Sequence, residues 1–133
     1  MIPKIIHYCW LGDDAYPDLV KNCIESWQQK LPDWELKLWD KKCLKELNSP
    51  WVLEAYEAKK YAFAADYIRL YSVYTYGGFY LDSDVEVLKD FTPLLKYPYV
   101  FCAENSEGDI EAATFGAEPH NQFVLRCLAY YEG

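Results

Sequence analysis

Two aspartates, Asp82 and Asp84, directly follow the apolar residues 79–81, which have the aromatic and branched side chains of a buried strand. In an extended chain, residues two apart point to the same side, so both carboxylates could bind one divalent cation through hard oxygen ligands. A cation held there could in turn hold a diphosphate. The carboxyl end of an apolar strand is also where open α/β sheets bind their ligands.

The Asp-x-Asp spacing alone is a weak signal, because the chain has 21 acidic residues and a solvated acidic turn would look the same. A second pair, Asp66 and Arg69, lies three residues apart within the helix predicted over residues 61–76, so both side chains share one helix face. They could form an ordinary surface ion pair. Because the helix leads through Gly77 and Gly78 directly into the Asp82 strand, they could also face the same site.

The rest of the chain alternates strands and helices, which is typical of an α/β domain with a mostly parallel sheet flanked by helices. We expect strands over residues 2–10, 34–38, 99–103 and 110–115, and helices over 17–31, 41–47, 51–59, 61–76 and from 119 onward. Helical spacing predicts an apolar stripe that includes Leu19 in the first helix, and one that includes Ala62, Ala65, Leu70 and Val73 in the helix over 61–76.

Composition limits the classes of function. The chain has 133 residues and a formal net charge of -8, which fits one domain over residues 1–133 and argues against nucleic acid or an anionic membrane as the main partner. The 5 cysteines are widely spaced and show no metal-site pattern, so we expect reduced thiols and a cytoplasmic protein. We expect neither a signal peptide nor a transmembrane segment, because no apolar run reaches about 18 residues.

No residue can be assigned as a catalytic base or nucleophile from the sequence. His7 lies inside the first predicted strand and is expected to be a hydrogen-bonded core histidine. Glu104, at the end of the strand predicted over residues 99–103, is the acidic candidate for an acceptor side.

Three segments occur together and in order: IPKIIHYCW at residues 2–10, YAFAADYIR at 61–69 and GGFYLDSDV at 77–85. Together they resemble the DXD-containing sugar transferases of glycosyltransferase family 32, a group that includes bacterial capsule and exopolysaccharide enzymes and fungal initiating mannosyltransferases. The glucosylating clostridial toxins look like distant relatives. The resemblance implies a GT-A fold, although members usually continue beyond the segment that matches residues 120–133, so this chain looks short at its C-terminus.

The resemblance also implies a function and roles for particular residues. It implies retaining transfer of a hexose from a nucleotide-diphosphate sugar, with UDP-hexose favoured over GDP-mannose, to a glycan or lipid-linked saccharide acceptor, with Mn²⁺ or Mg²⁺ as cofactor. A peripheral association with a membrane is compatible with such an acceptor. By this resemblance Asp82 and Asp84 bind the metal and diphosphate, Asp66 and Arg69 bind the donor sugar and diphosphate, Trp10 stacks on the nucleobase, and Leu11, Tyr80 and Ser83 line the donor pocket.

Two other functions remain open at this point. A phosphotransferase with an aspartyl nucleophile also has an apolar strand ending in Asp-x-Asp, although such sites usually continue with Gly-Thr or similar, and here Val85-Glu86-Val87 follows. A non-catalytic or truncated nucleotide-sugar-binding module would fit the short length. Donor binding without turnover would distinguish this module from a transferase.

Overall fold

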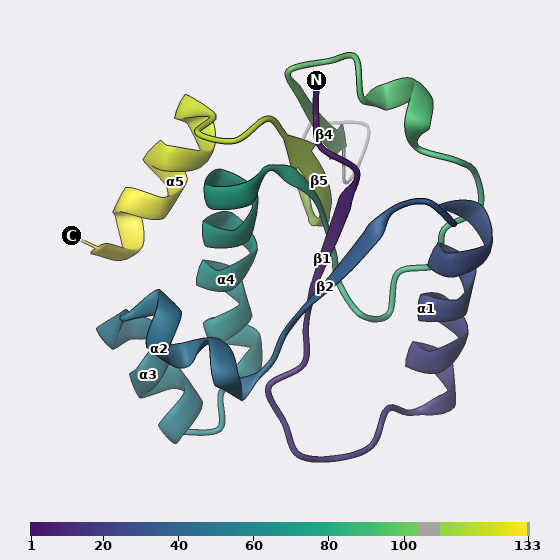
Figure 1. Ribbon diagram of the computed structural model, residues 1–133. Helices are drawn as coiled ribbons and strands as arrows, with labels where there is room; N and C mark the ends of the chain where they lie inside the picture. The colour runs from purple at the N-terminus through teal and green to yellow at the C-terminus, as the bar shows by residue number, and fades with distance from the viewer. Residues whose placement is uncertain (104–109, 133) are drawn as a thin grey trace.

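The computed structural model describes the backbone of residues 1–103 and 110–132, and the side chains of residues 1–101 and 114–131 (Figure 1). Its centre is a 5-stranded sheet with the order β2-β1-β3-β5-β4. The strands are β1 (Ile5–Cys9), β2 (Glu35–Trp39), β3 (Gly78–Leu81), β4 (Tyr99–Ala103) and β5 (Ile110–Ala117). β1 pairs in parallel with β2 and β3, whereas β5 is antiparallel to β3 and β4. β5 alone is therefore reversed among the described strands, and the mostly parallel sheet is confirmed.

The helices are α1 (Asp18–Lys30), α2 (Leu44–Leu47), α3 (Pro50–Glu57), α4 (Tyr61–Tyr76) and α5 (Gln122–Glu132), with 3₁₀ turns at Lys41–Cys43 and Thr92–Leu94. α4 has the predicted bounds. α5 begins later than predicted, because the Asn121 side chain accepts hydrogen bonds from the backbone N–H groups of Phe123 and Val124 and caps the helix there. In the described part of the chain, no helix is both long enough and apolar enough to span a membrane.

Helices cover both faces of the sheet, with α1 on one side and α4, supported by α3 and α5, on the other (Figure 1). Successive residues of β3 therefore pack in opposite directions. Phe79 and Leu81 join a core cluster with Trp27 of α1, whereas Tyr80 packs with Val73 of α4. β3 is buried on both faces, which explains why its sequence is apolar throughout.

Gly77 and Gly78 connect α4 to β3 without an intervening loop. Their φ angles are 71° and 107°, positive values that glycine adopts without strain. A Cβ atom on Gly78 would lie 2.6 Å from the carbonyl oxygen of Ile5 in β1. The close pairing of β3 with β1 therefore depends on a glycine at this position.

Two predicted apolar stripes are buried only in part: most of the α1 stripe and Val73 of the α4 stripe are buried, but other members are not. Leu19 is 62% exposed, although the neighbouring Val20 is buried in α1. In α4, Ala62 is exposed and Ala65 half-buried, whereas Ala64 and Ile68 are fully buried. The helical spacing was correct, but α4 packs on the sheet, α3 and α5 together, and these neighbours bury a different face.

The cysteines whose side chains are described, Cys9, Cys23, Cys43 and Cys127, are all free thiols, as predicted. Burial is the main cause that raises the pKa of Cys43 to about 12, and burial also raises the pKa of Cys9. Thiols in such surroundings are largely protonated at neutral pH and are poor nucleophiles.

Candidate functional site

A cavity of about 660 Å³ opens at the carboxyl ends of β1 and β3, and we call it the carboxyl-end cavity. β2 lies on one side of β1 and β3 on the other, so the cavity lies at the point where the strand order reverses, which is the usual ligand position in open α/β sheets. The residues that the sequence predicted for the site all line it: Trp10, Leu11, Asp66, Arg69, Tyr80, Asp82, Ser83 and Asp84. Three segments distant in sequence thus meet at one cavity.

Asp82 and Asp84 reach this cavity from a turn rather than from an extended strand. β3 ends at Leu81, and the backbone N–H of Val85 donates a hydrogen bond of 3.0 Å to the carbonyl oxygen of Asp82. The expectation that a strand period of two places the carboxylates side by side is therefore wrong in its geometry. Asp82 is half-buried, whereas Asp84 is exposed.

Asp82 and Asp84 could supply some, but not all, of the ligands of a bound cation. Within the described residues, no group of three or more His, Cys, Asp or Glu side chains is arranged to hold a metal ion. Asp82 and Asp84 offer hard oxygen ligands of the kind that Mg²⁺ and Mn²⁺ prefer. A cation bound here would need oxygens beyond these two carboxylates, and water and a diphosphate can supply them.

Asp66 and Arg69 form an ion pair in the cavity wall. The distance from Arg69 Nη2 to Asp66 Oδ1 is 2.6 Å, and the Arg69 side chain is only 15% exposed while that of Asp66 is 37% exposed. The Arg69 guanidinium also lies over the Tyr80 ring, 5.6 Å from the ring centre. This burial and the aromatic contact distinguish the pair from an ordinary surface ion pair.

Tyr80 connects this ion pair to the acidic turn. Its side chain is 1% exposed, and its hydroxyl is hydrogen-bonded to the Asp82 side chain. Burial, followed by the negative charge of Asp82, raises the pKa of Tyr80 well above its usual value. Tyr80 is therefore a neutral donor that holds the Asp82 carboxylate on one side and the Arg69 guanidinium on the other.

Trp10 lies at the mouth of the cavity and is not a core tryptophan. It is half-buried and belongs to none of the described core clusters. Its indole N–H donates to the carbonyl oxygen of Asp14 at 3.0 Å, and its ring meets Tyr16 edge-on with centroids 5.1 Å apart. These contacts hold the ring in place while part of it remains accessible to a ligand.

His7 is a buried structural histidine, as predicted. It is 0% exposed, and Trp39 Nε1 donates to its Nδ1 at 3.1 Å, so its Nε2 carries the proton and donates to the carbonyl oxygen of Gly77 at 2.8 Å. Burial lowers the pKa of His7 to about 4. Glu104, the predicted acidic candidate, lies outside the described residues.

Sequence reasoning missed several apolar residues of the cavity, including Leu19, Ala62, Phe63 and Ala65. Ala62 and Ala65 lie four residues before Asp66 and Arg69, respectively, so the same helix face carries all four side chains. That spacing was available in the sequence. Helical periodicity predicts that the face with Ala62 and Ala65 belongs to the core, because periodicity identifies an apolar face without showing whether it packs on the core or lines a cavity.

Comparison with known proteins identifies glycosyltransferases among the proteins that this chain resembles. The profile of a family described as "glycosyltransferase sugar-binding region containing DXD motif" matches residues 17–101. Inositol phosphoceramide mannosyltransferase 3 of Schizosaccharomyces pombe is 33% identical over 96% of this chain, and mannosyl phosphorylinositol ceramide synthase SUR1 of Saccharomyces cerevisiae is 31% identical over 96% of it. The chain spans 36% and 34% of the lengths of these two relatives.

A solved structure supports the fold. The PaToxG glycosyltransferase superposes with a TM-score of 0.75 at 18% sequence identity, covering 96% of this chain and 59% of the PaToxG chain. The fold predicted for the chain is therefore confirmed as that of a glycosyltransferase.

Proposed function

Because the chain belongs to the family of glycosyltransferases with a DXD-containing sugar-binding region, we propose that its carboxyl-end cavity binds a nucleotide-diphosphate sugar together with a divalent cation. We further propose that the protein transfers the sugar to an acceptor hydroxyl with retention at the anomeric carbon. The observation that carries the proposal is that the Asp82–Asp84 turn and the Asp66–Arg69 pair line one cavity. An aspartyl phosphotransferase does not fit the family match.

The donor's diphosphate would lie against the acidic turn. Asp82 and Asp84 would hold Mn²⁺ or Mg²⁺, which when bound stabilises the negative charge that develops on the leaving diphosphate. Arg69 brings a permanent positive charge to a wall that otherwise carries carboxylates among its described residues. Its planar guanidinium can give parallel hydrogen bonds to phosphate oxygens while it keeps its contact with Asp66.

The remaining residues would position the donor. Asp66 would accept hydrogen bonds from sugar hydroxyls, Trp10 would stack on the nucleobase, and Leu11 and Ser83 would line the pocket. In the transfer itself, the bond from the anomeric carbon to the diphosphate oxygen breaks with its electron pair going to the diphosphate. The acceptor oxygen bonds to the anomeric carbon on the same face, and its proton passes to the departing diphosphate or to water.

The comparisons bear on donor and acceptor in different ways. The resemblance to bacterial members of the family favours UDP-hexose, whereas both relatives carry mannosyl and inositol ceramide in their names, which favours a mannosyl donor such as GDP-mannose. The same names favour a lipid with a hydroxyl-bearing head over a polysaccharide as acceptor. We therefore propose a hexosyl donor, with the nucleotide to be decided by titration.

The test is a calorimetric titration with UDP, GDP, UDP-glucose and GDP-mannose, each with Mn²⁺ and with excess chelator. We expect one nucleotide to bind well with Mn²⁺ and weakly without it, because bare Asp82 and Asp84 repel a diphosphate. Asp84→Asn should remove most of the Mn²⁺-dependent affinity. Glu86→Gln is the matched control, since Glu86 is exposed nearby but does not line the cavity. Equal affinity in chelator would refute the proposal, and metal-dependent binding without transfer would indicate a binding module.

A further inference from the structure

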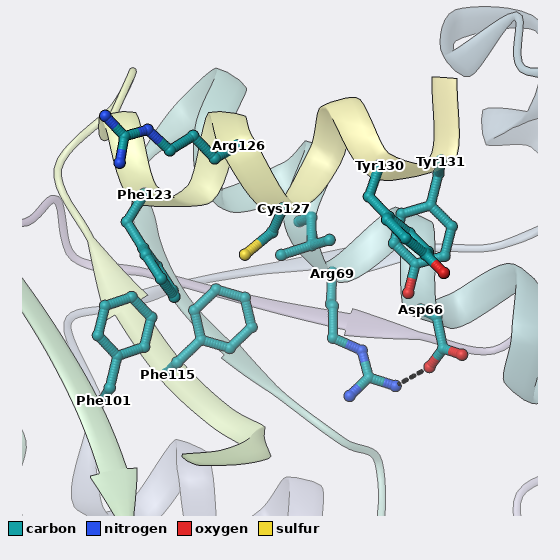
Figure 2. Close-up of a pocket in the computed structure, with 10 residues that line it drawn as sticks. Asp66, Arg69, Phe101, Phe115, Phe123, Arg126, Cys127, Tyr130 and Tyr131 are labelled. Atoms are coloured by element: carbon teal, nitrogen blue, oxygen red, sulfur yellow. Dashed lines mark hydrogen bonds and ion pairs between the residues drawn. The ribbon is translucent and has the colours of Figure 1, made fainter. Parts of the chain in front are cut away.

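A second cavity, of about 570 Å³, lies between α4, α5 and the β4–β5 pair, and we call it the aromatic cavity (Figure 2). Asp66 and Arg69 line both cavities, so this ion pair is a shared wall between them. Figure 2 shows the pair at one side of the aromatic cavity and Phe101, Phe115 and Phe123 at the other. A molecule in the aromatic cavity would thus end beside whatever occupies the carboxyl-end cavity.

The aromatic cavity has the Asp66–Arg69 pair at its shared wall and phenyl rings in its body, and the Arg126 side chain of α5 lines it beside Phe123. Phe101 and Phe115 stack with centroids 5.9 Å apart, and Phe123 meets Phe101 edge-on at 5.2 Å. Phenyl rings offer no hydrogen-bond partner, so hydroxyls of a sugar ring placed among them would lose their water contacts without replacement. A hydrocarbon group suffers no such loss, and it would cover Phe123, which is 48% exposed.

We infer that the aromatic cavity binds the hydrocarbon part of an amphipathic acceptor, whose hydroxyl-bearing head lies at the Asp66–Arg69 wall. The inference rests on the proposed function, because that function places the donor sugar on the opposite side of the same ion pair. The Asp66–Arg69 pair also lines the carboxyl-end cavity, whereas the three phenylalanines line only the aromatic cavity. An acceptor with a polar head and an apolar tail matches this order in both position and chemistry.

The test uses methyl, hexyl and octyl glucosides below their micellar concentrations, titrated calorimetrically into the whole chain. Affinity should rise with chain length by up to about fourfold for each methylene that is fully buried. Phe123→Ser should reduce the affinity for octyl glucoside at least fivefold and leave that for methyl glucoside unchanged. Cys127→Trp, which places a larger side chain in the cavity, should block octyl glucoside. Leu88→Ser is the control, because Leu88 is 71% exposed and lines neither cavity.

Nucleotide titrations on the same variants separate this inference from the proposed function. Phe123→Ser should bind nucleotide as the unmodified chain does. Nucleotide binding combined with equal affinities for methyl and octyl glucoside would overturn the inference and leave the proposed function intact. Octyl binding that depends on Phe123, without any nucleotide binding, would confirm the hydrocarbon site and overturn its role as an acceptor site. If the chain self-associates and Phe123→Ser abolishes this, the inference is overturned, because a second copy of the chain would then occupy the aromatic cavity.

Discussion

The indole nitrogen of Trp27 in α1 donates a hydrogen bond of 2.7 Å to the carbonyl oxygen of Val85, the residue that closes the turn after β3. The hydroxyl of the neighbouring Ser26 accepts a hydrogen bond of 2.9 Å from the backbone N–H of Val87. Helix α1 therefore fixes the chain directly after Asp84. The position of Asp84, a proposed metal ligand, therefore depends on Trp27, which lies 58 residues before Val85 in the chain.

Trp27→Phe should loosen the acidic turn. The substitution leaves the Val85 carbonyl without its donor, so the free energy of unfolding should fall by about 1 to 3 kcal/mol and Mn²⁺-dependent nucleotide affinity should fall as well. Trp34→Phe is a matched control, because the buried Trp34 Nε1 has no hydrogen-bond partner among the described residues. Denaturant unfolding and nucleotide titration would show whether only the first variant changes both quantities. A Trp27→Phe variant with unchanged nucleotide affinity would show that α1 does not set the turn.

Tyr80→Phe should weaken cation binding without removing the fold. The phenyl ring would keep its contact with Arg69, but the Asp82 carboxylate would lose the hydroxyl that orients it. Because a hydrogen bond to a charged group contributes roughly 1.5 to 3 kcal/mol, we expect about a tenfold or greater loss of Mn²⁺-dependent nucleotide affinity. The melting temperature serves as the control and should change little. Undiminished affinity would mean that the Tyr80 hydroxyl does not orient Asp82 for cation binding.

Asp66→Asn should weaken binding of the nucleotide sugar without weakening binding of the free nucleotide. Asp66 is proposed to accept hydrogen bonds from sugar hydroxyls, so affinity for the nucleotide sugar should fall by about tenfold while affinity for the free nucleotide stays nearly the same. Arg69→Lys should weaken both ligands, since the planar fork is lost although the charge remains. Paired titrations of nucleotide and nucleotide sugar measure this. If Asp66→Asn changes neither affinity, the ion pair is purely structural.

Trp10→Ala should weaken nucleotide and nucleotide sugar equally. Loss of a stacking ring costs about 1 to 3 kcal/mol per base, and Trp10 is outside the core, so thermal stability should be largely retained. Calorimetric titration beside a melting curve checks both expectations. A stability loss with full nucleotide affinity would reassign Trp10 to holding its own loop through Asp14.

His7 should make the protein less stable as the pH falls below about 6.5. The pKa of His7 is about 4 in the folded chain, because burial disfavours the charged ring, and about 6.5 in the unfolded chain, so the unfolded chain binds an extra proton between these pH values. Stability from this group is complete above pH 6.5, and about 3 kcal/mol is lost as the pH falls to 4. Unfolding curves from pH 7.5 to 4 measure the slope.

The sequence was informative where local chemistry decides the structure. Gly77 and Gly78 end α4 and begin β3 because only glycine fits their φ angles and the close approach to Ile5. Helical spacing placed Asp66 and Arg69 on one face, and the structure pairs them. The shared cavity was predicted because three motifs resembled one family, which local spacing alone could not have shown.

Tertiary contacts decide the features that the sequence did not reveal. The turn at Asp82 depends on Trp27, a residue 58 positions away from Val85 along the chain, so a strand-periodicity argument could not anticipate it. The exposed Leu19 and Ala62 look like core residues in a helical repeat, yet they line a cavity. Whether such residues line a cavity or join the core depends on which helices and strands pack against them, and residue spacing does not show this.

Because α4 leads directly into β3, the site tolerates insertions and deletions at some positions and not at others. Asp66 and Arg69 lie before this passage and Asp82 after it, with no loop between helix and strand to take up an extra residue. An inserted residue in the helix would rotate its two halves by about 100° relative to each other, and one in the strand would turn the following side chains to the opposite face. Homologous chains with the same site should therefore keep the spacing from Arg69 to Asp82 fixed, while insertions and deletions accumulate in segments such as residues 88–90, which are exposed and line neither cavity.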